Sequence, residues 1–339
     1  MTAFHRHLGR SVRGLALLLL ATLAGAVVFL LADRLRPLPP PLKLASNQWL
    51  GYEPLFLAQD AGSLNPKLVR LASLPSTTEV IRALQHGVAD AATLTLDETL
   101  SLAAAGLPLT VVAVADVSAG ADAVLLRSDL PDGAPLRGLR IGYEGTAVGA
   151  YVLSRFLQHN GIDLSSVSLS VVSPDNHAEA LRTHTLDAVV TYEPFITQMT
   201  GLARPVFTSA AIPGEVVDVL VVRTDLLRPE VTAHLRQVWL DGVSRLLSGD
   251  PARLDGTGRR HGLTPAMLRQ ALEGIRFPAA TDQAAYLNGT VPALGRQASA
   301  LWAAMENTRL IPAGARFPAL PFAPWPLPPA PTPQTGAAQ

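Results

Sequence analysis

Short apolar runs alternate along the chain with longer stretches in which apolar residues recur every three or four positions. The runs suit buried strands, and the longer stretches suit helices that bury one face. Strands are predicted at residues 42–46, 68–71, 90–95, 109–114, 139–143, 168–172 and 187–191. Helices are predicted at residues 54–62, 76–87, 97–105, 145–161, 177–183, 230–247, 264–275 and 281–307. The alternation predicts an α/β fold with mostly parallel sheets flanked by helices.

One strand–helix–strand unit occurs twice. Residues 42–45 (LKLA) begin the first unit and residues 139–142 (LRIG) begin the second. An Ala-Leu pair is followed, after five residues, by Asp-Ala in both units, at 83–91 and at 180–188. Both matches have the same offset, 97 residues (42 to 139 and 83 to 180). Two similar units predict two similar lobes, with a cleft between them for a small molecule.

Two apolar, β-branched segments, 123–127 and 216–223, lie between the units and after the second one. They are predicted to cross between the lobes. This organisation gives a first lobe of 42–123 and 224–310, with the C-terminal helices, and a second lobe of 124–223. Residues 311–339 are rich in Pro and Ala, and this tail is expected to be extended or disordered.

Residues 1–41 are expected to be a signal or anchor segment with a Pro-rich linker. Three arginines within the first 13 residues precede an uncharged run at 14–32, which is about long enough to span a bilayer. The positive charge before the run predicts an exported body, periplasmic or extracytoplasmic, tethered to the inner membrane by an N-terminal helix. Small residues at 24–26 leave a cleaved signal peptide as the alternative.

Composition and motifs exclude several functions. The 339 residues carry 27 basic and 27 acidic side chains, and this balance gives no support for binding nucleic acid. The chain has no cysteine, which excludes disulfides, thiolate metal sites and a cysteine nucleophile. Its 8 histidines form no H-x-x-x-H pair, no G-x-S-x-G elbow occurs, and the glycines at 256–262 lack the G-x-G-x-x-G spacing. The sequence therefore predicts no catalytic residue, no metal and no cofactor.

Polar and aromatic residues follow several predicted strands, which is where ligands bind in open α/β sheets. After the first strand, Trp49 and Tyr52 offer flat apolar surface with a polar edge. Asn47 and Gln48 offer amide donors and acceptors beside them. These four residues are candidates for ligand binding. The alternative is that Trp49 packs within its own lobe.

Two predicted helix starts are further candidates. Ser76, Thr77 and Thr78 begin one helix, and Gly145 and Thr146 begin the corresponding helix of the second lobe. Free backbone N–H groups and the positive end of the helix dipole suit a carboxylate, a sulfonate or a similar anion. Ser76 also starts a capping-box pattern, so the alternative is a plain helix cap.

Acidic residues stand at two strand ends, after Thr95 and after Tyr192. A carboxylate such as Glu193 suits an amino or ring N–H group of a ligand, and the alternatives are an interlobe salt bridge or a cap of the next helix. Acidic groups outnumber basic ones near the expected cleft: Glu53, Asp122, Glu144, Glu193 and Asp218. A ligand with a cationic or N–H donor end therefore fits more naturally than a purely anionic one.

Several of these stretches carry a family resemblance. Residues 49–58 (WLGYEPLFLA), 76–84 (STTEVIRAL), the Asp-Ala pairs at 90–91 and 187–188, and 192–194 (YEP) resemble the substrate-binding proteins of ABC importers. The group is the NMT1/THI5-like one, which includes proteins that bind nitrate, sulfonates, taurine or pyrimidine precursors. The similarity covers roughly residues 42–300.

The resemblance implies a type II periplasmic-binding-protein fold, in which two lobes joined by two crossing strands close around one ligand. It implies a sulfonate-, taurine- or nitrate-like or a pyrimidine-precursor-like ligand, delivered to a permease and its ATPase, and no enzyme activity. In such proteins the ligand lies against the segments that match residues 49–52, 76–78, 95, 145–146 and 192–193 of this chain. A ligand-sensing module and an enzyme on the same fold are the alternatives.

Overall fold

The computed structural model describes Thr22 and residues 39–326, apart from the side chain of Ala147. The chain divides into two compact units, Met1–Pro40 and Pro41–Gln339. The apolar run at 14–32 lies outside the described residues except for Thr22. In the part of the chain that the structure describes, no helix combines the length and the apolar content needed to cross a membrane.

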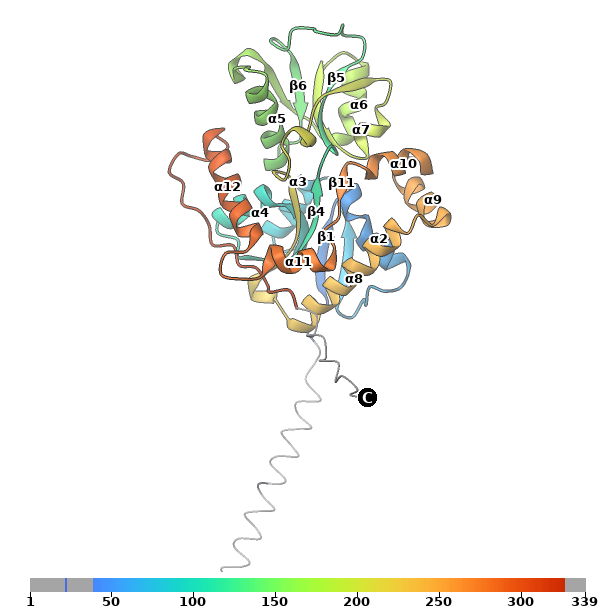
Figure 1. Ribbon diagram of the computed structural model, residues 1–339, viewed down its shortest axis with the longest axis vertical. Helices are drawn as coiled ribbons and strands as arrows, with labels where there is room; N and C mark the ends of the chain where they lie inside the picture. The colour runs from blue at the N-terminus through green and yellow to red at the C-terminus, as the bar shows by residue number, and fades with distance from the viewer. Residues whose placement is uncertain (1–21, 23–38, 327–339) are drawn as a thin grey trace, which may run out of the picture. The chain divides into compact units, whose positions relative to one another are not determined.

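Two mixed β-sheets form the centre of the second unit (Figure 1), as expected for a two-lobed α/β fold. Lobe 1 contains the six-stranded sheet, in the order β11-β4-β10-β3-β1-β2, and lobe 2 the five-stranded sheet, in the order β7-β6-β8-β5-β9. The strands are β1 (Leu42–Ser46), β2 (Val69–Ser73), β3 (Ala91–Thr95), β4 (Leu109–Ser118), β5 (Asp122–Arg127), β6 (Arg140–Tyr143), β7 (Ser168–Val171), β8 (Ala188–Tyr192), β9 (Ala203–Thr208), β10 (Val217–Arg223) and β11 (Ile275–Arg276).

Each sheet combines a parallel part with an antiparallel part, whereas the sequence pattern predicted mostly parallel sheets. β1 is parallel to β2 and β3, and β6 is parallel to β7 and β8. β10 is antiparallel to β3 and β4, and β5 is antiparallel to β8 and β9. The reason is that β5 and β10 enter their sheets from the other lobe, so they run opposite to the strands that end at the boundary between the lobes.

The two predicted crossings are the connections β4–β5 and β9–β10. β4 lies in the sheet of lobe 1 and β5 in that of lobe 2, with residues 119–121 between them. The chain returns from β9 to β10, which pairs in the sheet of lobe 1. The boundary predicted at residue 223 places residues 216–223 in lobe 2, whereas β10 pairs in lobe 1; an apolar run does not show which sheet it pairs with. The remaining lobe boundaries stay a prediction.

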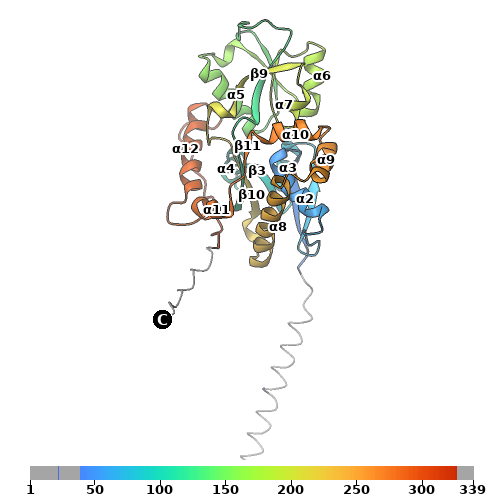
Figure 2. The ribbon, with the colours of Figure 1, turned by 45° about the vertical axis from the view of Figure 1, so that its right-hand side comes forward.

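Helices flank both sheets (Figures 1 and 2). They are α2 (Glu53–Asp60), α3 (Thr77–Gln85), α4 (Leu96–Ala104), α5 (Ala147–His159), α6 (His177–Arg182), α7 (Phe195–Gln198), α8 (Pro229–Leu247), α9 (Pro251–Arg260), α10 (Pro265–Leu272), α11 (Ala280–Leu287) and α12 (Ala293–Asn307). The described residues also form five short 3-10 helices: Leu50–Tyr52, Leu164–Ser166, Pro174–Asn176, Ser209–Ala211 and Thr224–Leu226. The single helix predicted at 281–307 is divided into α11 and α12, and Pro292 caps the start of α12.

α2 and α8 pack side by side in lobe 1, although they are far apart in the sequence (Figure 2). Their contact depends on Gly242 in the middle of α8. A methyl group at this position would lie 1.9 Å from the carbonyl oxygen of Pro54. Glycine lowers helix propensity, and here it is needed because it allows the two backbones to approach each other.

The sequence repeat corresponds to a repeated contact. In lobe 1 the backbone N–H of Lys43 donates to the carboxylate of Asp90 at 2.9 Å, and in lobe 2 that of Arg140 donates to Asp187 at 3.0 Å. Both pairs join the strand that begins a unit to the strand that follows its helix. The offset of 97 residues therefore relates equivalent positions of two lobes.

The C-terminal Pro-rich segment is extended and packed against lobe 1 as far as residue 326. Val111 of β4 accepts a hydrogen bond from the backbone of Ala323 at 2.8 Å and donates one to Pro321 at 3.0 Å. Trp325 is 7% exposed, and the guanidinium of Arg236 lies over its ring, 4.8 Å from the centroid. This part of the tail is ordered, so the expectation of an extended segment holds and that of disorder does not. Residues 327–339 lie outside the described residues.

Candidate functional site

The carboxyl ends of β1, β3 and β8 meet where the two lobes face each other. A small cavity lies there, which we call the seam cavity. Lobe 1 and lobe 2 both supply its lining: Asn47, Trp49, Tyr52, Thr77, Thr95, Glu98, Asp122, Val148, Tyr192 and Asp218. A neighbouring cavity on the side of lobe 2 shares Asp122, Val148 and Tyr192 and adds Glu144, Thr146, Gly149, Val152, Val190 and Thr191.

The lobes lie close together at the seam cavity. The space left for the centre of a water molecule is about 20 Å³, which suffices for about one water. Sites for organic ligands typically have volumes of about 300–1,000 Å³. The structure therefore shows the lobes closed on each other, and a larger ligand requires them to separate.

Strand register explains why polar side chains from both lobes meet in this cavity. Thr95 of β3 lies opposite Asp218 of β10, and Asp122 of β5 lies opposite Tyr192 of β8. Thr95 and Tyr192 are the last residues of strands that end at the seam, and Asp218 and Asp122 lie at or near the start of strands that enter from it. Thus β10 adds the carboxylate of Asp218 on the side of lobe 1, and β5 adds that of Asp122 on the side of lobe 2.

Two aromatic rings from opposite lobes meet across the cavity. Trp49 and Tyr192 are 5% and 8% exposed, and their ring centroids are 5.9 Å apart at an interplanar angle of 78°. The indole of Trp49 is held by a hydrogen bond from its Nε1 to the carboxylate of Asp116, at 3.2 Å. Gly51 makes this contact possible, because a methyl group there would lie 2.1 Å from Trp49 Nε1 and 2.2 Å from Asp116 Oδ2. Trp49 therefore packs within lobe 1 and lines the cavity as well.

The start of α3 contacts both lobes. Ser76 is the N-cap, and its hydroxyl accepts from the N–H of Glu79 at 3.3 Å. The hydroxyl of Thr77 accepts from the side-chain amide of Asn47 at 2.5 Å. The backbone N–H and the hydroxyl of Thr78 both donate to Glu144 Oε1 of lobe 2, each at 2.9 Å. The helix N-terminus predicted for an anionic ligand thus binds a carboxylate of the chain itself.

The other predicted site residues lie around the cavity rather than in its lining. Glu193 accepts from the N–H and the hydroxyl of Thr197, at 3.0 and 2.8 Å, so it caps α7. Gly145 is exposed, and Thr146 lines only the cavity on the side of lobe 2. Gln48 is half-buried outside both linings. Ligand contact by any predicted residue stays a prediction.

Two lining residues, Glu98 and Val148, were not among the candidates from the sequence. Asp218 was predicted from the sequence to be one of the acidic groups near the cleft, and it lines the cavity. Glu98 fits a capping pattern, since its carboxylate accepts from the N–H of Thr95 at 3.1 Å, and this structural explanation conceals its place in the cavity. Val148 carries no sequence signal that distinguishes it from other apolar helix residues.

Burial dominates the titration of the carboxylates at the seam. It raises the pKa of Glu98 to about 8, with a further contribution from the charge of Asp97, and the pKa values of Asp116 and Asp122 to about 7. Burial also raises the pKa of Asp218 well above its usual range, and the neighbouring Asp116 adds to this. Low dielectric and like charges both disfavour the ionised form, which explains the common direction.

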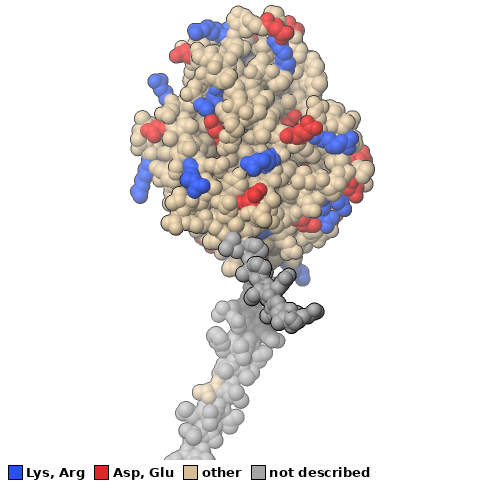
Figure 3. Space-filling model, viewed as in Figure 1, with Lys and Arg blue, Asp and Glu red and all other residues tan. Residues whose placement is uncertain are grey.

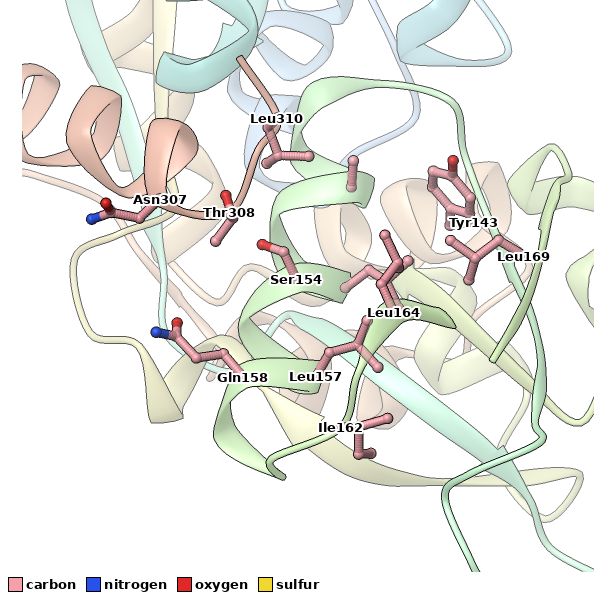
Figure 4. A pocket seen from close by; sticks show the side chains of 12 residues that line it. Tyr143, Ser154, Leu157, Gln158, Ile162, Leu164, Leu169, Asn307, Thr308 and Leu310 are labelled. Carbon is pink, nitrogen blue, oxygen red and sulfur yellow. The ribbon is translucent and has the colours of Figure 1, made fainter. Parts of the chain in front are cut away.

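A larger cavity, of about 340 Å³, lies elsewhere, between α5 and the end of α12. Figure 4 shows Leu157, Ile162 and Leu164 on one side of it, and Asn307 and Thr308 of the α12 end on another. Its lining is mostly aliphatic, and Leu164 is exposed. It is away from the strand ends at the seam and has few convergent polar groups, so we regard the seam cavity as the candidate binding site.

Two α/β lobes joined by two crossings, with polar strand ends facing each other at the seam, define the class of periplasmic-binding-protein folds. Within this class the chain belongs to the NMT1-like family, whose model matches residues 36–254. None of the curated proteins compared with the chain matched it.

Solved structures agree with this fold. The alkanesulfonate-binding protein SsuA from Xanthomonas axonopodis pv. citri bound to MOPS is 18% identical, with a TM-score of 0.68 over 81% of this chain and 96% of that one. A ligand-binding component of an ABC-type import system from Staphylococcus aureus with zinc bound is 15% identical, with a TM-score of 0.68 over 84% and 97%. The nitrate-binding protein NrtA from Synechocystis PCC 6803 is 12% identical, with a TM-score of 0.64 over 81% and 83%. Identities this low establish the common fold alone.

Proposed function

We propose that this chain is the solute-binding component of an ABC importer and binds one small organic ligand in the seam between its lobes. The observation that carries the proposal is the seam cavity itself, since both lobes line it and Trp49 faces Tyr192 across it. A ligand held there contacts both lobes at once, so its binding energy favours the closed arrangement over the open one.

The crossings β4–β5 and β9–β10 are the connections about which such lobes rotate. Opening would break interactions that join the lobes, among them the bonds of Glu144 to Thr78 and the edge-to-face contact of Trp49 with Tyr192. It would also break the hydrogen bond from the side chain of Gln198 to the carbonyl of His261, at 2.8 Å. Hinge closure of this kind sequesters a ligand from water. A permease distinguishes the closed, loaded form from the open one by the relative position of the two lobe surfaces.

In this proposal the chain works outside the cytoplasm, and its N-terminal segment at 14–32 tethers it to the membrane beside a permease and an ATPase. The ligand classes that the family resemblance implies are sulfonates, taurine, nitrate and pyrimidine precursors. Every charged residue that lines the seam cavity is acidic, namely Glu98, Asp122 and Asp218. Among these classes the lining favours ligands that carry N–H donors, such as taurine or an aminopyrimidine, over nitrate.

The proposal is tested on the full-length chain purified from cells. Small molecules released by denaturation are identified by mass spectrometry and added back while tryptophan fluorescence and the radius of gyration are measured. A ligand that binds, compacts the protein and loses affinity in Trp49→Ala supports the proposal. Binding that is unchanged in Trp49→Ala would move the site elsewhere, for example to the aliphatic cavity at α5. Conversion of the ligand into a product would instead indicate an enzyme.

A further inference from the structure

The carboxylates of the seam cavity are deeply buried and come from three separate elements. Glu98 of α4 is 1% exposed, Asp218 of β10 is 2% exposed and Asp122 of β5 is 7% exposed. By contrast, Lys and Arg side chains alternate with Asp and Glu on the surface viewed in Figure 3, and neither sign gathers into a patch there. The excess of acidic groups thus distinguishes the cavity from the face of the molecule shown in this view.

Hydrogen bonds that the structure gives these carboxylates come from neutral donors. The hydroxyl of Tyr52 donates to Asp218, and the backbone N–H of Thr95 donates to Glu98 Oε2. Burial of ionised carboxylates without a positive partner is costly, so such groups are protonated or pair with a cation. Their raised pKa values are consistent with a cavity in which the positive partner comes from outside the protein.

Unused hydrogen-bonding atoms point to a ligand independently of the charge. Among the described residues, Glu98 Oε1 and the hydroxyl of Tyr192 are buried and have no hydrogen-bond partner. Both residues line the seam cavity, one from each lobe. In folded proteins nearly all buried polar atoms are satisfied, and exceptions call for an explanation. An ammonium group has three donors, which suit a free carboxylate oxygen and a hydroxyl oxygen.

The aromatic walls add to the same chemistry. Trp49 and Tyr192 line the cavity beside the carboxylates. An organic cation near the face of a tryptophan or tyrosine ring is attracted by the ring quadrupole, and more strongly where water is excluded. Carbon atoms attached to the charged nitrogen gain apolar contact with the same rings.

The position best suited to an anion, the N-terminus of α3, is already occupied by a carboxylate of the chain. The N-terminus of α3 donates the N–H and the hydroxyl of Thr78 to Glu144, which is 6% exposed. To bind there, a sulfonate or nitrate must displace this carboxylate and then approach Glu98 and Asp122. Both steps are electrostatically unfavourable.

We infer that the ligand of the seam cavity carries a protonated amine, which Glu98, Asp122 and Asp218 recognise together with the rings of Trp49 and Tyr192, and that Glu144 excludes anions. This inference rests on the proposed function, because it specifies the ligand class of the same site. The recognised group is an organic ammonium group. A ligand that carries both an ammonium and an anionic group agrees with the inference only if the ammonium group contributes most of the affinity.

The test uses matched ligands and the full-length chain at neutral pH. Within each of two trios the compounds share one carbon skeleton and differ in charge. The first trio is ethylammonium, ethanol and ethanesulfonate, and the second is benzylammonium, benzyl alcohol and phenylmethanesulfonate. Affinities are measured by titration calorimetry and tryptophan fluorescence. In at least one trio the ammonium member should bind about 10-fold more tightly than its neutral and anionic counterparts, a difference of about 1.4 kcal/mol. A preference for the sulfonate members would overturn the inference.

Variants separate recognition from folding. Glu98→Gln and Asp122→Asn should each weaken binding of the ammonium probe about 10-fold while unfolding remains cooperative. Glu79→Gln, at an exposed acid on α3, is the matched control and should leave the affinity unchanged. Unchanged affinity in Glu98→Gln and in Asp122→Asn, with both variants folded, would contradict the assignment. Competition by magnesium, calcium or zinc chloride at lower concentration than the ammonium probe would assign the carboxylates to a metal and overturn it as well.

The same experiment distinguishes this inference from the proposed function. A co-purified ligand without a basic nitrogen, bound at Trp49 and compacting the protein, would overturn the ammonium inference and leave the proposed function intact. Absence of any co-purified molecule, together with no binding of either trio, would count against both.

Discussion

Glu144 of lobe 2 accepts two hydrogen bonds from Thr78 of lobe 1, one from its backbone N–H and one from its hydroxyl, both at 2.9 Å. A carboxylate from one lobe therefore occupies the helix N-terminus of the other. Carboxylates are stabilised at this end of a helix by the dipole and by N–H groups that have no partner within the helix. The contact joins the lobes without a ligand, so it sets how far the unliganded protein stays closed.

Glu144→Gln tests this role. Glutamine keeps an acceptor oxygen but accepts more weakly than a carboxylate, so the two bonds from Thr78 should weaken. Because burial raises the pKa of Glu144, removal of its charge offsets part of this loss, and we expect the free energy of unfolding to change by less than about 1 kcal/mol. The unliganded protein should also open, which small-angle X-ray scattering detects as a larger radius of gyration. Glu79→Gln is the control, because it changes an acid of the same helix turn that does not reach lobe 2. An unchanged radius of gyration in Glu144→Gln would show that the pair does not hold the lobes together.

Tyr52 and Tyr192 form a matched pair, since both line the seam cavity and only one hydroxyl has a partner. Tyr52 donates to Asp218, whereas the hydroxyl of Tyr192 has no partner among the described residues. An unsatisfied buried hydroxyl costs about 1–3 kcal/mol. Tyr192→Phe should therefore keep or raise the stability of the unliganded protein, and Tyr52→Phe should lower it by about 1–3 kcal/mol.

Tyr192→Phe should affect ligand affinity differently from stability. If its hydroxyl bonds to the ligand, Tyr192→Phe weakens affinity by about 5- to 10-fold although the protein is no less stable. Urea unfolding and calorimetry on both variants provide the two readouts. Loss of stability in Tyr192→Phe would reveal a partner for the hydroxyl within the protein, and unchanged affinity would remove the hydroxyl from the site.

Gly51→Ala should disturb the seam without unfolding lobe 1. The added methyl group would lie 2.1 Å from Trp49 Nε1 and 2.2 Å from Asp116 Oδ2, so their hydrogen bond must break and the indole must move. We expect ligand affinity to fall at least about 10-fold, with a loss of about 1–3 kcal/mol in stability. Gly256→Ala in α9 is the control, because a methyl group there meets no atom within 4 Å. Wild-type affinity in Gly51→Ala would show that the orientation of Trp49 is unimportant.

Sequence patterns could predict those features that depend on local order along the chain. The equivalent contacts of Lys43 with Asp90 and of Arg140 with Asp187 follow from a repeat that is readable as letters. The residues that follow strand ends, such as Trp49 and Tyr192, were also predictable, because the ends of parallel strands meet at one edge of a sheet. Neither the repeat nor the position of residues after strand ends depends on how the two lobes face each other.

Features that depend on pairing between distant segments could not be predicted. The sequence placed the acid of Asp218 near the cleft but not opposite Thr95, because nothing local in an apolar run specifies the neighbour or the direction of β10. Glu144 reaches Thr78 because the lobes close, and the same sequence pattern suited an external anion equally well. The sequence thus predicts a helix end that suits an anion, whereas the group that occupies this end in the structure, Glu144, is set by tertiary contact.

The buried carboxylates of the seam should make the free energy of unfolding decrease as the pH rises. Burial raises the pKa of Asp97 to about 6, of Asp116 and Asp122 to about 7 and of Glu98 to about 8, and it raises those of Asp218, Glu144 and Glu193 as well. Each of these groups binds more protons in the folded than in the unfolded chain between its two pKa values. Their contribution to stability is therefore present below about pH 4 and is lost as the pH rises to about 8.

Urea unfolding of the unliganded chain at several values between about pH 5 and 8 checks this expectation. Stability should fall as the pH rises through this range, because the folded chain holds these protons more tightly than the unfolded chain does. Glu98→Gln should flatten the slope above about pH 7, where Glu98 releases its proton in the folded chain, and Glu79→Gln should leave the slope unchanged. A cationic ligand should flatten it too, because it favours the ionised carboxylates and releases their protons on binding. An equal slope above about pH 7 in Glu98→Gln and in the unchanged chain would mean that Glu98 is already ionised in the folded protein, with a positive partner of its own.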